Sequence, residues 1–216
     1  NLTRLVAPKK GEVILDIGCG EGYFAKKFAG DGARVIGIDN SKRLIALAQK
    51  TAGKNEQYFA WSADNLPSLK DASVDKITII LAVQNMDNVH SVFKECRRVL
   101  KTARADGGAG GRLYIVMNHP AFRVPKASDW VWDEKTGTQY RRIDAYLTES
   151  KAKIQMHPGE APNDYTVSFH RPLQFYFKLL KNSGFGVANL EEWISDKKSD
   201  PGPRAQAEDK ARKEIP

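Results

Sequence analysis

The chain has 216 residues, of which 41% are hydrophobic and 28% are charged. That length supports one α/β domain with a substantial core and excludes two full domains. No apolar run reaches the roughly 18 residues that a membrane-spanning helix needs, and no signal segment opens the chain. The two cysteines, Cys19 and Cys96, are too few for a disulfide framework, as is typical of a reducing compartment. We therefore expect a globular, cytoplasmic protein.

The net charge of +8 lies mainly in the first half, where residues 1–117 contain 18 Lys and Arg against 12 Asp and Glu. These basic residues are spread along predicted helices. A diffuse basic surface is typical of a solvated face rather than of a groove that follows a phosphate backbone. The charge therefore does not favour a nucleic-acid partner.

The first 117 residues alternate apolar, strand-like runs with amphipathic, helix-like stretches. Ser41 is placed to cap a helix. Strands are predicted over residues 13–17, 33–38, 56–60, 74–83 and 112–117, and helices over residues 23–29, after Ser41, and over 88–100. Strands that alternate with helices imply right-handed βαβ units and a parallel sheet.

The remainder of the chain has a different pattern. Residues 118–168 are rich in Pro, Trp, Tyr and charge without a sustained period, which predicts a structureless lid or binding insertion. A helix is predicted over residues 173–182, opened by Pro172 and ended by Gly184, and a further strand over 185–194. The charged tail, 196–216, has no core residues, although its end can form a helix. We expect a single domain over 1–195 that contains the insertion.

Closely spaced glycines follow the first predicted strand, where residues 15–22 read LDIGCGEG. Such a turn lets the backbone approach a ligand at the positive end of the next helix. The spacing is G-x-G-x-G, because Tyr23 replaces the last glycine of the dinucleotide pattern G-x-G-x-x-G. Asp39, at the end of the second strand, lies at a suitable separation to bind ribose hydroxyls. The alternative is a plain glycine turn with a surface carboxylate, and the two features together favour a nucleoside ligand.

The ordered motifs resemble the class I S-adenosylmethionine-dependent methyltransferases, methyltransferase domain type 11. The matching segments are VILDIGCGEG at 13–22, GID at 37–39, ADNLP at 63–67, VDKI at 74–77 and FKECRRVLK at 93–101. The resemblance covers residues 10–117 and resumes over 172–194. It implies an α/β fold with a Rossmann-like, doubly wound, mostly parallel sheet, flanking helices and a lid insertion after the fifth strand. The family's final antiparallel strand has no counterpart, so we expect the sequence to be trimmed at both ends.

The resemblance also implies a binding site for S-adenosylmethionine, with S-adenosylhomocysteine as product and no metal. Asp16 would organise the glycine loop, and Asp39 would hold the ribose hydroxyls. Asp64 would accept a hydrogen bond from the adenine amino group. The other implied cofactor residues are Gly18, Cys19 and Gly20 at the methionine part, Asn40, Ala63, Asn65 and Leu66 around adenine, and Ala82 and Val83 near the amino group and methyl.

The acceptor is expected near the loops after the fourth and fifth strands. His119, directly after the fifth strand, is the first candidate for a general base or acceptor-orienting group, and a histidine bonded to the backbone is an equal alternative. Gln84 and Asn85 are the other catalytic candidates, at positions where many relatives carry a histidine pair. For His157 and His170, turn and helix-cap roles are the simpler interpretation. No Cys or His spacing indicates a zinc site.

These observations lead to one predicted function and several alternatives. The prediction is a methyltransferase that modifies an oxygen or nitrogen atom of a small molecule, with no membrane partner. The alternatives are an RNA or protein methyltransferase with the same cofactor site, and a non-catalytic protein that binds S-adenosylmethionine. A nicotinamide-dependent oxidoreductase is disfavoured by Tyr23 and by the segment around Asp64. The oligomeric state and the identity of the acceptor are left open.

Overall fold

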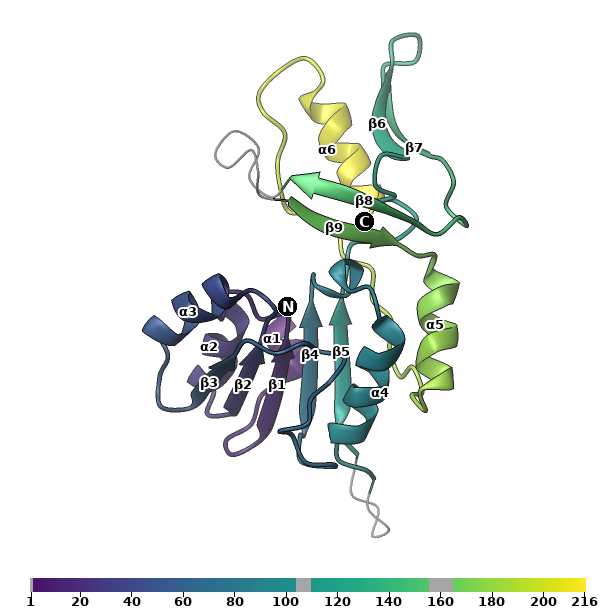
Figure 1. The fold of residues 1–216 in the computed structure, drawn as a ribbon. Helices are drawn as coiled ribbons and strands as arrows, with labels where there is room; N and C mark the ends of the chain where they lie inside the picture. The colour runs from purple at the N-terminus through teal and green to yellow at the C-terminus, as the bar shows by residue number, and fades with distance from the viewer. Residues whose placement is uncertain (1, 104–109, 156–164) are drawn as a thin grey trace. The chain divides into compact units, whose positions relative to one another are not determined.

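The computed structural model describes residues 2–103, 110–155 and 165–216 (Figure 1). The chain forms two compact units. The first contains Asn1–Met117 and Asn182–Phe185, and the second contains Asn118–Lys181 and Gly186–Pro216. Each unit is described separately below.

The first unit is built on a parallel sheet with the strand order β3-β2-β1-β4-β5. The described strands are β1 (Val13–Ile17), β2 (Arg34–Ile38), β3 (Glu56–Phe59), β4 (Lys76–Ile80) and β5 (Arg112–Val116). The chain runs outward from β1 to β3 and then returns to β4 on the other side of β1. Ligands of open α/β sheets bind at such a reversal of strand order, beyond the carboxyl ends of the strands. The α/β fold class and the parallel sheet predicted from the sequence are confirmed.

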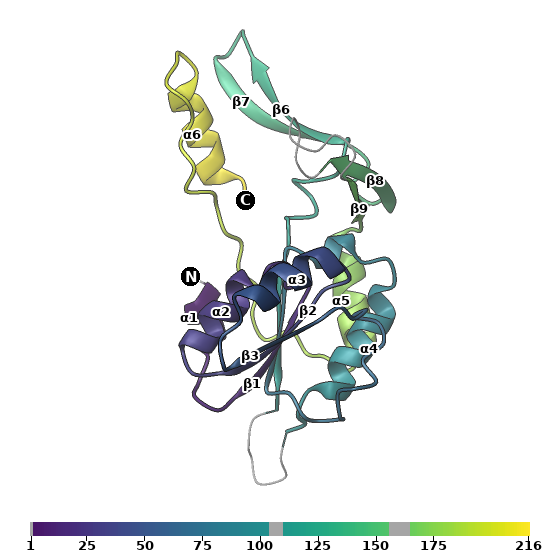
Figure 2. The same cartoon turned by 60° about the vertical axis from the view of Figure 1, so that its left-hand side comes forward.

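Helices cover both faces of this sheet, and Figure 2 shows α1 and α2 on one side and α4 on the other. The elements are α1 (Leu2–Val6), α2 (Tyr23–Gly30), α3 (Lys42–Lys50), the 3-10 turn η1 (Val83–Asn85) and α4 (Val89–Val99). The predicted cap is confirmed, because Ser41 Oγ accepts a hydrogen bond from Leu44 N at 3.3 Å. Asn88 caps α4 in the same way through Ser91 N. Caps and apolar faces therefore determine where these helices start and which side they bury.

One apolar cluster joins the first three helices to the sheet. Phe28 from α2 and Ile14 from β1 are fully buried in it, and Ile45 from α3 is nearly so. Strands β1 and β4 are buried on both faces, as expected for central strands of a parallel sheet. The rigid part of the first unit therefore lies directly beneath the loops that follow these strands.

The second unit contains two antiparallel hairpins and two helices. The strands are β6 (Ser128–Asp133) with β7 (Thr138–Ile143), and β8 (Ser150–Gln155) with β9 (Tyr165–His170). The helices are α5 (Leu173–Asn182), which has the predicted bounds, and α6 (Ala205–Glu214). The helical end predicted for the tail is thus confirmed.

Two predictions for this part of the chain are wrong. The described residues between 118 and 168 are not structureless, because they form paired strands. These strands are polar and alternate only weakly in hydrophobicity, so they leave little apolar signal in the sequence. Residues 185–194 do not form a strand, since none of the described strands pairs with them. An apolar run becomes a strand only where it finds a hydrogen-bonding neighbour. Here Val187, Leu190 and Ile194 remain exposed.

Candidate cofactor site

The glycine loop after β1 is held by the backbone of β2 and pressed against the segment after β4. Gly18 N and Cys19 N both donate to Ile38 O, at 2.8 and 3.0 Å. Gly18 has φ +70°, and a Cβ built there would lie 2.5 Å from Ala82 Cβ. No L side chain fits that position without displacing a neighbour. Gly18 therefore permits a close contact between the loops after β1 and β4, while the approach of the glycine loop to a ligand stays a prediction.

Asp39, directly after β2, links this loop to the start of α3. Its Oδ2 accepts from Gly20 N at 3.0 Å, and its Oδ1 accepts from Ser41 N at 2.8 Å. A carboxylate has about four acceptor sites, so each oxygen keeps one for a further donor. Asp39 can thus hold the glycine loop and accept hydrogen bonds from a bound diol at the same time. Asn40 follows it on the exposed surface.

Asp16 lies underneath the glycine loop, on β1, with only 2% of its surface exposed. Its Oδ1 accepts a hydrogen bond from the Thr78 hydroxyl on β4 at 2.7 Å. Burial raises the pKa of Asp16 to about 7, the Thr78 bond opposes that rise, and the charge of Asp39 adds to it. The site therefore has a buried carboxyl group that changes charge near neutral pH.

The segment after β4 begins with a strained residue. Leu81 has φ +53°, which ends the strand three residues before the predicted boundary, and its N donates to Val116 O at 2.7 Å. Its carbonyl oxygen accepts from Gln84 Nε2 at 2.8 Å. Gln84 Oε1 is buried and has no hydrogen-bond partner among the described residues. Gln84 therefore has an acceptor available for a ligand, whereas Asn85 is exposed.

The loop after β3 carries the residues predicted to surround adenine, from Ala63 to Leu66. Asp64 Oδ1 accepts a hydrogen bond from Ser62 Oγ at 2.5 Å. Leu66 is fully buried, and its backbone is bonded to Glu95 and Arg98 of α4. Because parallel strands end at the same edge of a sheet, the loops after β1, β2, β3 and β4 all lie along one edge (Figure 1).

His119, the predicted base, belongs to the second unit. Its Nε2 lies 2.7 Å from Glu192 Oε1, and its Nδ1 accepts from Ala121 N at 3.2 Å. The Ala121 bond places the ring proton on Nε2, which then donates to Glu192. Glu192 was not singled out in the sequence, where it lies in the stretch predicted as a strand.

The other histidine predictions have different outcomes. His170 is buried, and its Nε2 lies 2.7 Å from the carbonyl oxygen of Tyr146, which is a bond to backbone distant in the sequence rather than a turn or helix-cap contact. His157 lies outside the described residues.

In the part of the chain that the structure describes, neither a metal-binding cluster nor a membrane-spanning helix is found. Within residues 2–103, 110–155 and 165–216, no three His, Cys, Asp or Glu side chains gather in a way that could hold a metal ion. In the same ranges, no helix has the length and apolar character needed to span a bilayer.

Comparison with known proteins agrees with this geometry. Residues 15–103 match the model of the methyltransferase domain family. The chain is 35% identical over 120 residues to a ubiquinone/menaquinone biosynthesis C-methyltransferase of Rubrivivax gelatinosus, covering 55% of this chain and 45% of the relative. It is 33% identical over 98 residues to a ubiquinone biosynthesis O-methyltransferase of Thiobacillus denitrificans, covering 44% and 42%. The chain thus spans less than half the length of these curated relatives.

A similar fold is found in a solved structure. The S-adenosylmethionine-dependent methyltransferase of Mesorhizobium loti superimposes with a TM-score of 0.73 at 25% identity, over 90% of this chain and 84% of that chain. The family resemblance seen in the sequence is confirmed.

Proposed function

Residues 15–103 form a domain of the methyltransferase family, and from this premise we propose that the protein transfers a methyl group from S-adenosylmethionine to an oxygen or nitrogen atom of a small molecule. One observation carries the proposal. The Asp39 carboxylate is bonded to the glycine loop through Gly20 N, at the edge of the sheet where the strand order reverses. This arrangement presents backbone and carboxylate together to a nucleoside.

The residues at this edge fit S-adenosylmethionine. Gly20, at φ +56°, has nothing within 4 Å of where a Cβ would lie, so a ligand can approach its backbone, and the unpartnered Gln84 Oε1 can accept from the ammonium group of the ligand. Asp39 and Asp64 each keep acceptor capacity for hydroxyl and amino donors. When bound, this cofactor supplies an electrophilic methyl group on a positively charged sulfur. The negative charge of Asp39 suits that cation, and so does that of Asp16 where its carboxyl, with a pKa raised by burial to about 7, is ionised.

Methyl transfer is an in-line displacement, so these residues act mainly by orientation, which can contribute about 7–11 kcal/mol. Where the acceptor must lose a proton, His119 is the proposed base, with Glu192 as its partner. Its Nδ1 is bonded to Ala121 N at 3.2 Å, a long hydrogen bond that a closer donor can replace. Orientation by the first unit and proton removal by His119 are then separable contributions to turnover.

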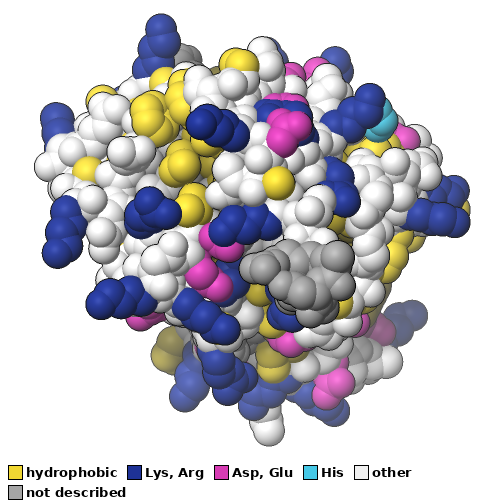
Figure 3. Space-filling model, turned by 90° about the horizontal axis from the view of Figure 1, so that it is seen from below, with side chains coloured by type: hydrophobic (Ala, Val, Ile, Leu, Met, Phe, Trp, Pro, Cys, Tyr) yellow, Lys and Arg dark blue, Asp and Glu magenta, His cyan; other side chains and the backbone are white. Residues whose placement is uncertain are grey.

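A small-molecule acceptor is favoured by the relatives. Figure 3 shows the face at the amino ends of the parallel strands, opposite the glycine loop, and there Lys and Arg side chains stand singly or in small groups among neutral and acidic ones. This face does not resemble a continuous phosphate-binding groove. The two quinone-pathway relatives are named as a C- and an O-methyltransferase, so the accepting atom has to be identified from the product.

The cofactor part of the proposal is tested by calorimetry with S-adenosylhomocysteine. Asp39→Ala removes the acceptor for ribose hydroxyls and the bond to Gly20 N, and should weaken binding at least tenfold, or about 1.4 kcal/mol. Asp31→Ala, at an exposed carboxylate after α2, is the matched control and should bind like the parent. Equal affinity in Asp39→Ala and the parent would refute the ribose contact.

The acceptor part is tested by transferring a radiolabelled methyl group into cell extract and separating small molecules, RNA and protein. Label in the small-molecule fraction supports the proposal, and mass spectrometry then identifies the modified atom. Label only in RNA or protein would favour those alternatives, and binding without transfer would favour a non-catalytic protein.

A further inference from the structure

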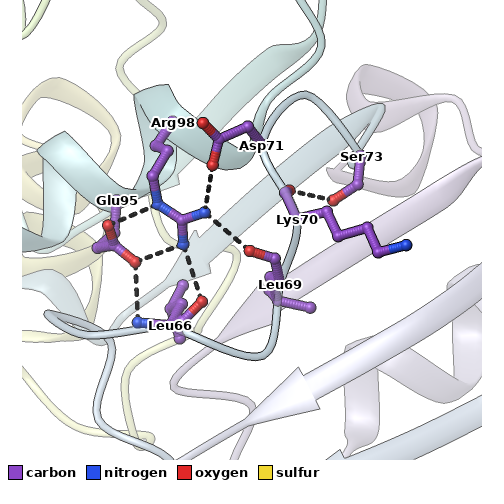
Figure 4. A network of polar contacts seen from close by, with 7 residues as sticks. All are labelled: Leu66, Leu69, Lys70, Asp71, Ser73, Glu95 and Arg98. Carbon is purple, nitrogen blue, oxygen red and sulfur yellow. Dashed lines mark hydrogen bonds and ion pairs between the residues drawn. The ribbon is translucent and has the colours of Figure 1, made fainter.

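A network of polar contacts joins α4 to the loop between β3 and β4 (Figure 4). Arg98 and Glu95, one turn apart on α4, form a bidentate ion pair. Arg98 Nε lies 2.8 Å from Glu95 Oε1, and Arg98 Nη2 lies 2.7 Å from Glu95 Oε2. Arg98 Nη1 also donates to the Asp71 carboxylate at 2.7 Å. Bidentate pairs are geometrically specific, and the ammonium group of a lysine does not reproduce them.

The same two side chains hold the backbone of the loop. Leu66 N donates to Glu95 Oε2 at 2.8 Å, and Leu66 O accepts from Arg98 Nη2 at 2.8 Å. Arg98 Nη1 donates to Leu69 O at 2.8 Å, while the carbonyl oxygen of Arg98 accepts from Ala72 N at 3.0 Å. Leu66 is fully buried in a segment without helix or strand, so its polar backbone groups need such partners. Arg98 therefore fixes the loop at several points.

The network is partly shielded from water, which gives it more strength than an ordinary surface pair. The Glu95 and Arg98 side chains are 18% and 30% exposed. The hydrogen bond from Arg98 lowers the pKa of Glu95 below its usual range, so the pair is charged at neutral pH. Deleting Glu95 would leave Leu66 N without its acceptor, and deleting Arg98 would leave Leu66 O without its donor, in a partly buried place.

We propose that Arg98, together with Glu95, is a positioning residue for the adenine ring, acting through the loop that presents Asp64. This inference rests on the proposed function, because it takes Asp64 as the acceptor for the adenine amino group. Two peptide bonds separate Asp64 from the clamped backbone of Leu66. Ser62 Oγ already donates a hydrogen bond to Asp64 Oδ1. The conformation of the loop then determines where the second carboxylate oxygen, Oδ2, points. Arg98 thus controls how well the site distinguishes adenine from other purines.

A purely structural role for Arg98 would weaken all ligands alike, so the test measures discrimination. S-Inosylhomocysteine differs from S-adenosylhomocysteine at purine position 6, where a carbonyl acceptor replaces the amino donor, and at the neighbouring N1, which then carries a proton. An oriented carboxylate rejects that change, because two acceptors then face each other unpaired. The ratio of the two dissociation constants therefore reports the position of Asp64.

The experiment compares the parent, Arg98→Lys and Arg97→Lys by calorimetry with both ligands. Arg98→Lys keeps the charge but cannot reach all of the acceptors, and we expect the preference for the adenine ligand to fall at least about threefold. Arg97, the exposed neighbour on the same helix, is the matched control, and its variant should keep the parent's ratio. Glu95→Gln retains an acceptor for Leu66 N while losing the ion pair, and should lower the ratio less.

The outcomes separate the inference from the proposed function. An unchanged ratio in both Arg98→Lys and Glu95→Gln, even with a lower melting temperature, would show that the network only stabilises the fold. If the parent binds S-adenosylhomocysteine but prefers neither purine, Asp64 does not read adenine and the inference also fails. A parent that does not bind the ligand at all overturns the proposed function itself.

Discussion

The two units hold their candidate functional residues in different ways. In the first unit, backbone contacts hold the site, because Gly18 N and Cys19 N bond to Ile38 O and Gly20 N bonds to Asp39. In the second unit, His119 is held by an exposed side chain, Glu192, and by one long bond from Ala121 N. Loops fixed by a buried sheet keep their geometry when side chains change, whereas a histidine held by an exposed carboxylate does not.

This difference suggests a division of work between the units. In the proposed function, the first unit supplies loops whose donors and acceptors are already fixed, so little ordering is needed when the cofactor binds. In the second unit, arginine side chains lie over tryptophan rings, as Arg141 does over Trp130 and Arg204 over Trp132. We therefore expect substitutions in the first unit to change cofactor affinity, and substitutions at His119 to change turnover.

The largest expected effect comes from filling the close approach at Gly18. Gly18→Val would place a branched side chain at φ +70° and against Ala82, so the loops after β1 and β4 must separate. Affinity for S-adenosylhomocysteine, measured by calorimetry, should fall more than about a hundredfold, or roughly 2.7 kcal/mol.

The control for this substitution is Gly30→Ala, at the end of α2, where an added Cβ meets nothing within 4 Å. It should bind like the parent. Parent-like binding in Gly18→Val would mean that the loops that meet at Gly18 and Ala82 do not form the cofactor site. Loops held by backbone contacts would then not explain cofactor binding by the first unit.

A smaller effect, confined to turnover, is expected in the second unit. His119→Ala should lower kcat at least about tenfold with cofactor affinity unchanged, since general bases contribute in this range or above it. Glu192→Gln, which keeps a hydrogen-bond acceptor but removes the charge facing His119, should lower kcat less. Steady-state kinetics with the identified acceptor provide the measurement, and equal kcat in His119→Ala and the parent would exclude the histidine from the reaction.

The sheet of the first unit could be predicted because its central strands are buried on both faces. Ile14, Leu15 and Ile17 are all fully buried, so burial and hydrophobicity coincide along β1. The glycine motif was also readable, since its geometry depends on the absence of side chains. The positive φ of Leu81 could not be predicted, because it accompanies a hydrogen bond from Leu81 N to Val116 O on β5, which no local sequence pattern indicates.

Other features depend on contacts between polar groups that lie far apart in the sequence. His119 and Glu192 are far apart in sequence, and no periodicity relates them. Arg98 and Glu95 were visible as part of a family motif, yet their bonds to the backbone of Leu66 required the fold. The hairpin strands carry few buried apolar residues, so their pairing rests on cross-strand contacts that no hydrophobic period indicates.

A moderate effect is expected from pH, through Asp16 in the first unit. Its pKa of about 7 means that the carboxyl is mostly protonated at pH 6 and mostly ionised at pH 8. Because only the ionised form attracts a sulfonium, affinity for S-adenosylmethionine should rise relative to that for S-adenosylhomocysteine over this interval. A several-fold change in the ratio of dissociation constants is expected, given about 1.4 kcal/mol per tenfold.

Ionisation of Asp16 has the opposite effect on folding stability, which falls as the pH rises. A raised carboxyl pKa stabilises the folded state below pH 3.8, and this contribution is lost as the pH rises toward 7. Asp16→Asn, which cannot ionise, should flatten both profiles. A parent ratio that is constant from pH 6 to 8 would show that Asp16 does not sense the charge on sulfur.

The smallest expected effect concerns the attachment of α6 in the second unit. Arg204 lies 4.8 Å from the ring centroid of Trp132 and 2.6 Å from the Glu134 carboxylate, and α6 packs against β7. Arg204→Ala should destabilise this contact by about 0.5–1 kcal/mol, since exposed cation–π and ion pairs each contribute in this range. Thermal unfolding followed by tryptophan fluorescence measures the loss, with Lys210→Ala, exposed on α6, as the control. If cofactor affinity fell in Arg204→Ala by as much as in Asp39→Ala, the two units would not act separately, because a contact within the second unit would then govern binding at the glycine loop of the first.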